Sequence, residues 1–419
     1  MTRPDDLEPD HLEPDHLEPE VLEPDDLDPK EPDPEEPDPD DQGREEDRWA
    51  RAVLATVAEP GDRALHELVA RVGGARALAA LRTGHAADSV PAALRYRARI
   101  GLADPVALHE LTVRAGARLV VPTDAEWPAG LDLLGGLAGA VSAPPLALWV
   151  RGTHRLADAQ PRVVVAVVGA RAATTYGCDV ASSIAYELAE RGVVVVSGAA
   201  YGIDGAAHRA ALAAGGTTVA VLASGVDRAY PVGHEALLER IAAQGAVVSE
   251  APPGRHPSRA RFLTRNRIIA AMSAGVVVVE AALRSGALNT AHWATQLSTH
   301  VMAVPGPVTS AMSAGPHRAV IDRGASLVTD AADVLELVSP VGVGTQAMRR
   351  GEERPRDHLP ADAVALLEAL PARAAREAGQ LAVAAGLSVD AAIGALGLLA
   401  ADRWVERAEA GWRRVPQRG

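Results

Sequence analysis

Apolar residues recur at intervals of three and four in the stretch that follows the acidic N-terminal segment of the chain. This spacing places side chains on one face of a helix. The residues that show it are Trp49, Val53, Val57, Leu65, Leu68, Val72, Leu78 and Leu81. Gly73, Gly74 and Gly101 divide the pattern into short pieces. The sequence therefore predicts a small helical domain over residues 45–118.

Residues 119–339 alternate short, continuously apolar runs with helical stretches. Strands that are buried on both faces have this composition, and helices between them indicate a parallel sheet. The runs are Val163–Val168, Val193–Val196, Thr217–Leu222, Ala246–Val248, Val276–Val279 and His300–Val304. The fold class predicted for this region is α/β, with a Rossmann-like, mostly parallel sheet as the core.

The last part of the chain has a different pattern. Residues 340–358 are polar and contain glycine, which predicts a linker, and residues 359–419 predict a winged-helix-like domain. Its expected parts are three helices at Ala361–Leu370, Gly379–Ala385 and Val389–Ala401, with Ser388 as an N-cap, and two strands over Trp404–Val415 that turn at Gly411. The third helix contains no basic residue, so we expect it to contact protein and not duplex DNA.

Composition changes this picture at the N-terminus. Residues 1–44 repeat Leu-Glu-Pro-Asp units and carry few large apolar side chains, which predicts a disordered acidic tail. The tail is interpreted either as an extended solubilising segment or as an acidic decoy for a basic groove in the same chain.

Charge and cysteine content narrow the class of protein. Residues 1–48 hold 22 acidic residues against 4 basic ones, so the remaining 371 of the 419 residues carry a balance of +4. Lys30 is the only lysine, which excludes a P-loop, and a single cysteine excludes both an intramolecular disulfide and a cysteine metal cluster. With no signal peptide and with glycine, proline or polar residues in every long uncharged run, a soluble cytoplasmic protein is expected.

Several predicted strands end in turns that suit an anion. Gly169 and Arg171 follow the first strand, and the second runs into Ser197, Gly198, Tyr201 and Gly202. Glycine lets backbone N–H groups approach a phosphate, and arginine offers forked donors. A surface arginine without a role is the alternative for Arg171. Together with Ser285 and Gly286 after a later strand, these turns predict one long groove, although helix capping by Ser285 also fits.

Asp204 and His208 lie four residues apart, which would place them on one face of a helix. This spacing fits an acid–base pair. It also fits a capping aspartate followed by an internally bonded histidine, and that interpretation is favoured.

The stretch 251–279 has no acidic residue and five arginines around the only phenylalanine of the chain, Phe262. Cations attract phosphates and a flat apolar ring stacks with unpaired bases, so the stretch is typical of a single-stranded nucleic-acid site. A buried phenylalanine that anchors a loop is the alternative. Asn266 would either position its arginine neighbours or satisfy a turn.

These motifs together resemble those of the DNA-processing protein A (DprA, also called Smf) family. The matching stretches are SGAAYGIDGAAH from Ser197, LASGVDRAYP from Leu222, SEAPPG from Ser249, FLTRNRIIA from Phe262, VVVEAALRSGALNTA from Val277, AVPGP from Ala303 and DRGASLV from Asp322. The resemblance is dense over residues 120–335, and the acidic tail lies outside it.

The resemblance implies a non-enzymatic protein without a cofactor or metal. Such a protein binds single-stranded DNA, forms a homodimer through its Rossmann-like domain and helps to load the RecA recombinase in natural transformation or recombination and repair. By position, the resemblance implies that Arg171, Phe262, Arg265, Asn266 and Arg267 bind DNA. The turns at the strand ends add the remaining predicted DNA-binding residues, Gly169, Ser197, Gly198, Tyr201, Gly202, Ser285 and Gly286. Tyr201 stands where the family usually has a basic residue, and it offers a stacking face instead.

The alternative function is a nucleotide-binding or nucleotide-hydrolysing Rossmann-like protein. Related phosphoribohydrolases carry a Pro-Gly-Gly-x-Gly-Thr-x-x-Glu stretch, whereas this chain has Glu280 followed by Ser285 and Gly286 at the corresponding strand end. Dependence of binding on DNA length would distinguish the two functions.

Overall fold

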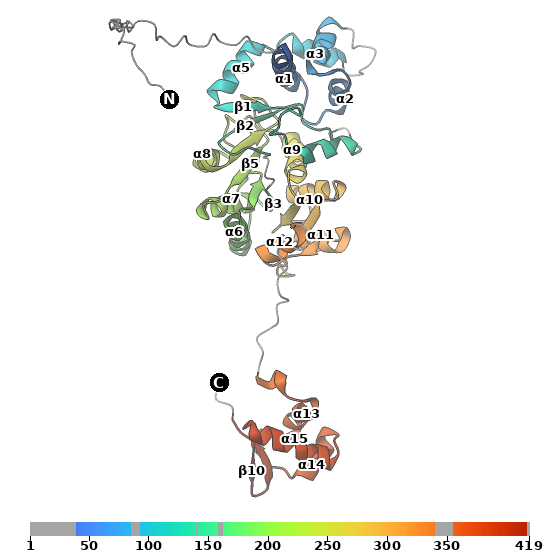
Figure 1. The fold of residues 1–419 in the computed structure, drawn as a ribbon, viewed down its shortest axis with the longest axis vertical. Helices are drawn as coiled ribbons and strands as arrows, with labels where there is room; N and C mark the ends of the chain where they lie inside the picture. The colour runs from blue at the N-terminus through green and yellow to red at the C-terminus, as the bar shows by residue number, and fades with distance from the viewer. Residues whose placement is uncertain (1–38, 85–92, 140, 158–161, 340–354, 417–419) are drawn as a thin grey trace, which may run out of the picture. The chain divides into compact units, whose positions relative to one another are not determined.

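The computed structural model describes residues 39–84, 93–139, 141–157, 162–339 and 355–416. Most of the acidic tail and most of the predicted linker lie outside these residues, so the decoy interpretation of the tail and the linker stay predictions. Contacts between residues divide the chain into two compact units, Met1–Val341 and Gly342–Gly419. Figure 1 shows the helices and strands of both units.

The larger unit is built on one nine-stranded sheet in the order β1-β2-β6-β5-β4-β3-β7-β8-β9. From β6 to β9 all neighbouring strands are parallel, whereas β1 and β2 join the edge in antiparallel pairs. The strands are β1 (Ala117–Val120), β2 (Leu148–Arg151), β3 (Val164–Val168), β4 (Val194–Ser197), β5 (Thr218–Leu222), β6 (Ala246–Ser249), β7 (Gly275–Val278), β8 (His300–Ala303) and β9 (Ser326–Leu327). The predicted Rossmann-like sheet is confirmed.

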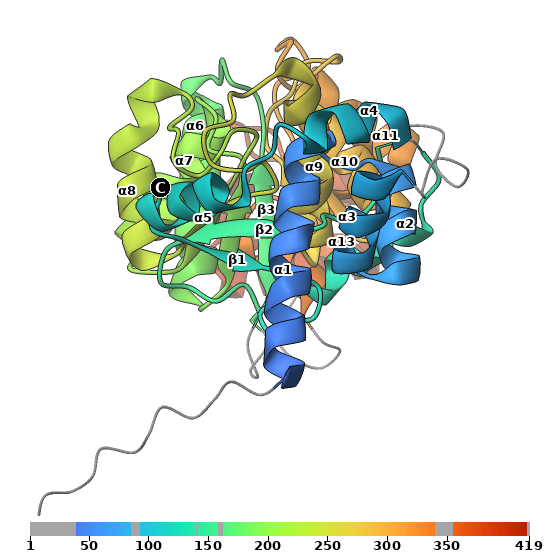
Figure 2. The same cartoon turned by 90° about the horizontal axis from the view of Figure 1, so that it is seen from above.

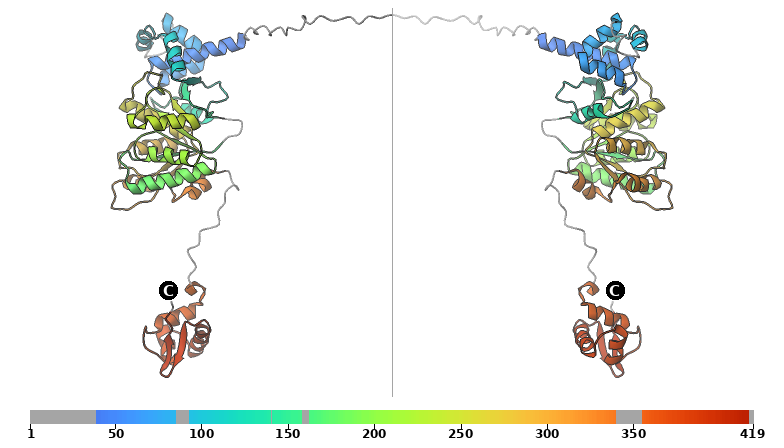
Figure 3. Two further views of the ribbon diagram at one scale, coloured as in Figure 1. Left: turned by 90° about the vertical axis from the view of Figure 1, so that its left-hand side faces the viewer. Right: turned by 90° about the vertical axis from the view of Figure 1, so that its right-hand side faces the viewer.

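Helices cover both faces of the sheet (Figures 1 and 3). Strand residues alternate between the faces: Val165 and Val167 share a core with α6 and α7, whereas Ala166 and Val168 share one with α9 and α10. The helices after β3 are α6 (Thr175–Glu190), α7 (Ile203–Ala213), α8 (Glu235–Gln244), α9 (Arg259–Ala271), α10 (Gly286–Gln296), α11 (Ala314–Arg323) and α12 (Ala331–Val338).

The first five helices pack against the sheet at the β1–β2 side (Figure 2). They are α1 (Pro39–Val57), α2 (Arg63–Val72), α3 (Gly74–Thr83), α4 (Ala93–Ile100) and α5 (Pro105–Arg114). Leu54 and Leu65 belong to the same buried core as Trp149 of β2 and Ala220 of β5. The N-terminal helices and the sheet are therefore one compact unit with a continuous core.

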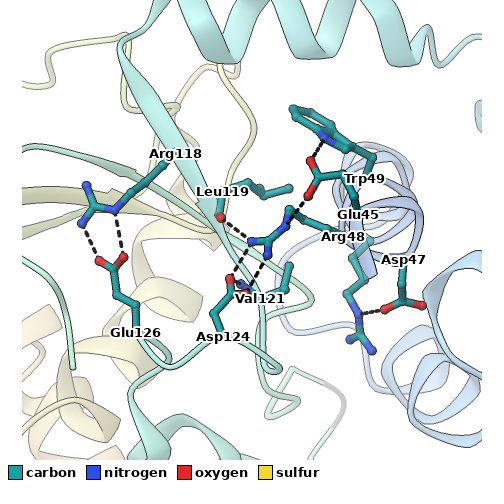
Figure 4. A network of polar contacts seen from close by, with 10 residues as sticks. Glu45, Asp47, Arg48, Trp49, Arg118, Leu119, Val121, Asp124 and Glu126 are labelled. Carbon is teal, nitrogen blue, oxygen red and sulfur yellow. Dashed lines mark hydrogen bonds and ion pairs between the residues drawn. The ribbon is translucent and has the colours of Figure 1, made fainter. Parts of the chain in front are cut away.

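Polar contacts fix α1 to the edge of the sheet (Figure 4). The guanidinium of Arg48 donates two hydrogen bonds of 2.7 Å to the Asp124 carboxylate and one of 3.0 Å to the carbonyl oxygen of Leu119 in β1. Arg118 in β1 forms a similar pair with Glu126 in the loop that follows this strand. Paired arginine–carboxylate contacts of this kind specify geometry as well as attraction.

The smaller unit has the elements that the sequence predicts. They are α13 (Ala361–Ala369), α14 (Ala378–Ala385), α15 (Val389–Ala401), β10 (Val405–Ala408) and β11 (Gly411–Arg414). The hydroxyl of Ser388 accepts a hydrogen bond from the Ala391 N–H and so caps α15. Leu366, Leu381 and Leu396 from the three helices form its buried core.

The larger unit differs from the sequence prediction in three strands that were not predicted, β1, β2 and β9, and in the basic stretch. Residues 119–152 contain β2, whose four residues lie in a stretch rich in glycine and proline. The middle of the basic stretch forms the helix α9 (Arg259–Ala271), although the apolar residues of this helix show no helical spacing. That spacing is absent because arginine, asparagine and threonine side chains are buried between apolar neighbours along α9.

Among the described helices, none is by itself both long and apolar enough to cross a membrane. The bent pair of α14 and α15, which meet at 105°, reaches the required length and composition when the two are taken together.

Candidate nucleic-acid interface

A cleft of about 660 Å³ opens at the carboxyl ends of the central strands. Its walls come from the turn after β3, the segment after β7 and the first turns of α9 and α10. Strand β3 begins the series that continues through β4 to β6 on one side, and β7 to β9 lie on its other side. Ligands of doubly wound sheets bind at such a reversal of strand order, so this cleft is the expected site.

Three side chains, those of Arg171, Phe262 and Tyr230, contact one another along one wall of the cleft. The guanidinium carbon of Arg171 lies 4.7 Å from the centre of the Phe262 ring, and the ring of Tyr230 lies 5.3 Å from Phe262 on a tilted plane. Arg171 is exposed and Tyr230 is 41% exposed. A cation beside two partly open aromatic faces matches a nucleotide, which has a charged phosphate and a flat base.

Two further arginines line the cleft, and neither forms an ion pair or a hydrogen bond through its side chain in the described part of the chain. Arg259 lies in the first turn of α9, and Arg284 lies just before α10. Both are exposed. With Arg171 they supply three cations on the cleft, and arginine suits phosphate oxygens because its donors form a planar fork.

Arg265 and Asp204 form the buried floor of the cleft. The Arg265 guanidinium donates to the carbonyl oxygens of Gly198, at 2.9 Å, and Val221. Burial lowers the pKa of Arg265 to about 10, against the opposing attraction of Asp204. Burial also raises the pKa of Asp204, which accepts hydrogen bonds from the N–H groups of Gly198 and Ala200. Arg265 borders the cleft, but its guanidinium N–H groups bond to Gly198 after β4, to Val221 in β5 and to the Asn266 side chain.

Asn266, Ser285 and Gly286 join the starts of two helices at the cleft. The Asn266 amide donates to the Gly286 carbonyl oxygen at 3.1 Å and to the Asn289 side chain at 3.2 Å. The Ser285 hydroxyl accepts from the Ala287 N–H and caps α10, as the capping alternative predicts. The N-terminus of α10 therefore borders the cleft, where its partial positive charge favours an anion.

The comparisons with known proteins agree on one family. The family model of DNA recombination-mediator protein A matches residues 118–339. A putative DNA processing protein DprA from Mycobacterium tuberculosis is 46% identical over 372 residues, which are 87% of this chain and 93% of that protein. This chain belongs to the DNA recombination-mediator protein A family.

Two further members of the DNA recombination-mediator protein A family are similar over shorter lengths. Protein Smf from Escherichia coli is 45% identical over 194 residues, or 46% of this chain and 50% of that protein. The X-ray structure of DNA processing protein A from Streptococcus pneumoniae superposes with a TM-score of 0.60 at 31% identity. The superposition covers 70% of this chain and 98% of the Streptococcus pneumoniae chain.

In this member of the DNA recombination-mediator protein A family, Arg267 lies away from the cleft. Its side chain is fully buried, and its guanidinium donates two hydrogen bonds of 2.8 Å to the Glu250 carboxylate and one of 3.0 Å to the Ala143 carbonyl oxygen. A guanidinium without exposed surface has no donor free for phosphate. The sequence-based assignment of Arg267 to DNA binding is therefore corrected to a structural role.

Three other predicted residues, Ser197, Tyr201 and Gly202, do not line the cleft. Ser197 is buried, and its hydroxyl donates to the Val167 carbonyl oxygen at 2.7 Å. Gly202 has a φ of 75° and lies against the Ala170 carbonyl oxygen, where a side chain would not fit. Tyr201 is half exposed but does not line the cleft, because its ring packs against His234 at 4.8 Å.

The side chains proposed for acid–base chemistry have structural partners. His208 is fully buried with its Nδ1 2.7 Å from the Thr218 hydroxyl, and burial lowers its pKa to about 3, so it is neutral near pH 7. Glu280 accepts hydrogen bonds from the N–H and hydroxyl of Thr174, which caps α6. Among the described residues, no hydrogen bond joins His208 or Glu280 to Asp204.

Sequence reasoning missed Tyr230 and Arg284 as candidates. Both lie in stretches that carry the family resemblance, and both follow a strand of the sheet. Their position after a strand was the available signal, since the carboxyl ends of parallel strands meet at one edge.

Proposed function

We propose that this protein binds single-stranded DNA in the cleft and acts as a recombination mediator without enzymatic activity. The observation that carries the proposal is the contact of exposed Arg171 with Phe262, whose ring in turn packs at a tilt against the ring of Tyr230. Bases of a single strand are free to stack on such rings, whereas those of a duplex are already stacked with each other. Arg259 and Arg284 supply further phosphate contacts.

The proposed absence of catalysis is supported by the roles of the carboxylates and the buried histidine. Glu280 holds Thr174 at the start of α6, and Asp204 holds the N–H groups of the turn after β4. We also propose a homodimer that helps to load RecA, and both parts rest on membership of the family. A monomeric mass by light scattering would contradict the homodimer. If adding this protein left RecA filament formation on single-stranded DNA unchanged, the loading role would be contradicted.

Fluorescence anisotropy of labelled single strands of several lengths, with a duplex control, tests DNA binding. We expect affinity to rise with strand length, to exceed affinity for duplex and to fall with salt. Because three exposed arginines line the cleft, the slope of log K against log salt should be about −2, at about −0.7 for each phosphate neutralised. Saturable binding of mononucleotides without length dependence would favour the nucleotide-binding alternative instead.

Arg171→Ala is expected to weaken binding to all single-stranded sequences alike, by about fivefold at moderate salt, and to reduce the salt slope by about 0.7. The reason is that a phosphate contact carries no base information. The measurement is the same anisotropy titration at several salt concentrations.

Arg209→Ala is the matched control for Arg171→Ala. Arg209 is an exposed arginine on α7 that lines a different, shallow surface beside Cys178 and Tyr186. Its removal changes the net charge equally, so its affinity and salt slope should stay near those of the unsubstituted protein. Equal losses in the two variants would show a general charge effect and would remove Arg171 from the site.

A further inference from the structure

The turn between α1 and α2 contacts the helix that carries the aromatic wall of the cleft. The Arg261 guanidinium on α9 donates two hydrogen bonds of 2.9 Å to the Glu59 carboxylate, and a third of 2.7 Å to the His256 carbonyl oxygen. Arg255, just before α9, donates to the carbonyl oxygen of Thr56 at the end of α1. Two of the five arginines in the basic stretch therefore bind the N-terminal helices.

The same turn makes a second contact close to α9. The N–H of Gly61 donates to Glu250 at 3.2 Å, and Glu250 is the partner of buried Arg267 on α9. Gly61 has a φ of 80°, and a β-carbon there would lie 2.5 Å from the Val141 carbonyl oxygen and 3.1 Å from Thr264. The turn is thus closely packed between the loop before β2 and α9.

Residues of α9 are divided between two faces by helical spacing. Arg259, Phe262, Leu263 and Asn266 line the cleft. Arg261, Thr264 and Arg267 instead contact Glu59, Gly61 and Glu250. Positions three and four apart share a face of a helix. A contact that moves the face with Arg261 therefore also moves the face that lines the cleft.

The N-terminal helices are themselves fixed to the sheet, which gives the turn a firm base. Arg48 on α1 pairs with Asp124 after β1 (Figure 4). Leu54 and Leu65, on either side of the turn, are fully buried in the core shared with the sheet. The backbone on both sides of Glu59 is therefore held in place by contacts that do not involve the cleft.

We propose that Glu59 is a positioning residue for the DNA cleft. Through Arg261 it fixes the first turn of α9 and so holds Phe262 in contact with Arg171 and Tyr230. This inference rests on the proposed function, because it takes single-stranded DNA as the ligand of the cleft. In this proposal the turn between α1 and α2 helps to shape the DNA-binding site.

The sign of one substitution distinguishes positioning from simple charge. Glu59 is 59% exposed and negative near a proposed site for a polyanion. If it acted by charge alone, Glu59→Gln would tighten DNA binding, because a repulsive carboxylate is removed. If it positions α9, the same substitution weakens binding although the protein becomes more positive.

The experiment uses the full chain and a labelled oligothymidine. We expect Glu59→Gln to weaken affinity by about two- to fivefold, the size of an exposed ion pair, with an unchanged salt slope because no phosphate contact is lost. Arg261→Glu should weaken affinity further, and the double variant Glu59→Arg with Arg261→Glu should recover most of it, because the pair is restored with the same net charge.

Glu67→Gln is the matched control, since Glu67 on α2 pairs with Arg63 in another exposed ion pair of the N-terminal helices. It should leave affinity unchanged. Tighter or equal binding by Glu59→Gln, or no recovery in the double variant at an unchanged melting temperature, would overturn the positioning role while DNA binding stands. Absence of binding by the unsubstituted protein would overturn the proposed function and this inference together.

Discussion

Arg267→Ala is expected to lower the free energy of unfolding by about 3–5 kcal/mol, the cost of breaking a buried ion pair by removing one partner. Arg267 is fully buried, and the Glu250 side chain is 9% exposed, so the substitution leaves a carboxylate without its cation and an empty volume beside it. Gly61 also depends on Glu250, so the loss should extend to the turn between α1 and α2. The effect should be the largest of any arginine in α9.

Thermal melting followed by circular dichroism measures this effect. A loss of that size corresponds to a fall in melting temperature of about 10 °C in a domain of a few hundred residues. The double variant Arg267→Met with Glu250→Leu should be less destabilised than Arg267→Ala, because it removes both charges and keeps the volume. A stable Arg267→Ala protein that has lost DNA affinity would return Arg267 to the interface.

Phe262→Ala is expected to weaken single-stranded DNA binding by about 1–3 kcal/mol, or roughly fivefold to 150-fold, the range measured for loss of one stacking side chain. Phe262 contacts both Arg171 and Tyr230, so its removal also frees the cation and the second ring from their positions. We expect the change to exceed that of Arg171→Ala, since two other cleft side chains depend on this ring.

Anisotropy titrations of Phe262→Ala, Phe262→Leu and Phe262→Trp separate stacking from packing. Leucine keeps apolar volume but has no flat face, so it should behave like alanine, whereas tryptophan should retain affinity. The salt slope should be the same in all three, because no charged group is removed. If the Phe262→Leu variant bound DNA with the affinity of the unsubstituted protein, Phe262 would be an apolar anchor of α9 and not a stacking residue.

The strands of the core could be predicted because their signal is local. Six continuously apolar runs correspond to β3–β8 within one or two residues, since strands buried on both faces must be apolar along their whole length. The helix α15 could be predicted in the same way, with Ser388 marking its start. By contrast, β2 was missed because its burial depends on pairing with β6, about a hundred residues later.

The sequence by itself determined the fold class, the family resemblance and part of the cleft, including Arg171 and Phe262, but not Tyr230 or Arg284. Among the four arginines of residues 259–267, the sequence-based prediction chose Arg265 and Arg267 for DNA binding and left out Arg259 and Arg261. The tertiary structure divides them differently: Arg259 is exposed on the cleft, Arg261 pairs with Glu59, and the other two are buried. The physical reason is that burial and pairing depend on partners remote in sequence, such as Glu59 at 202 positions from Arg261. A guanidinium contacts DNA or stabilises the fold according to which partner the folded chain places beside it.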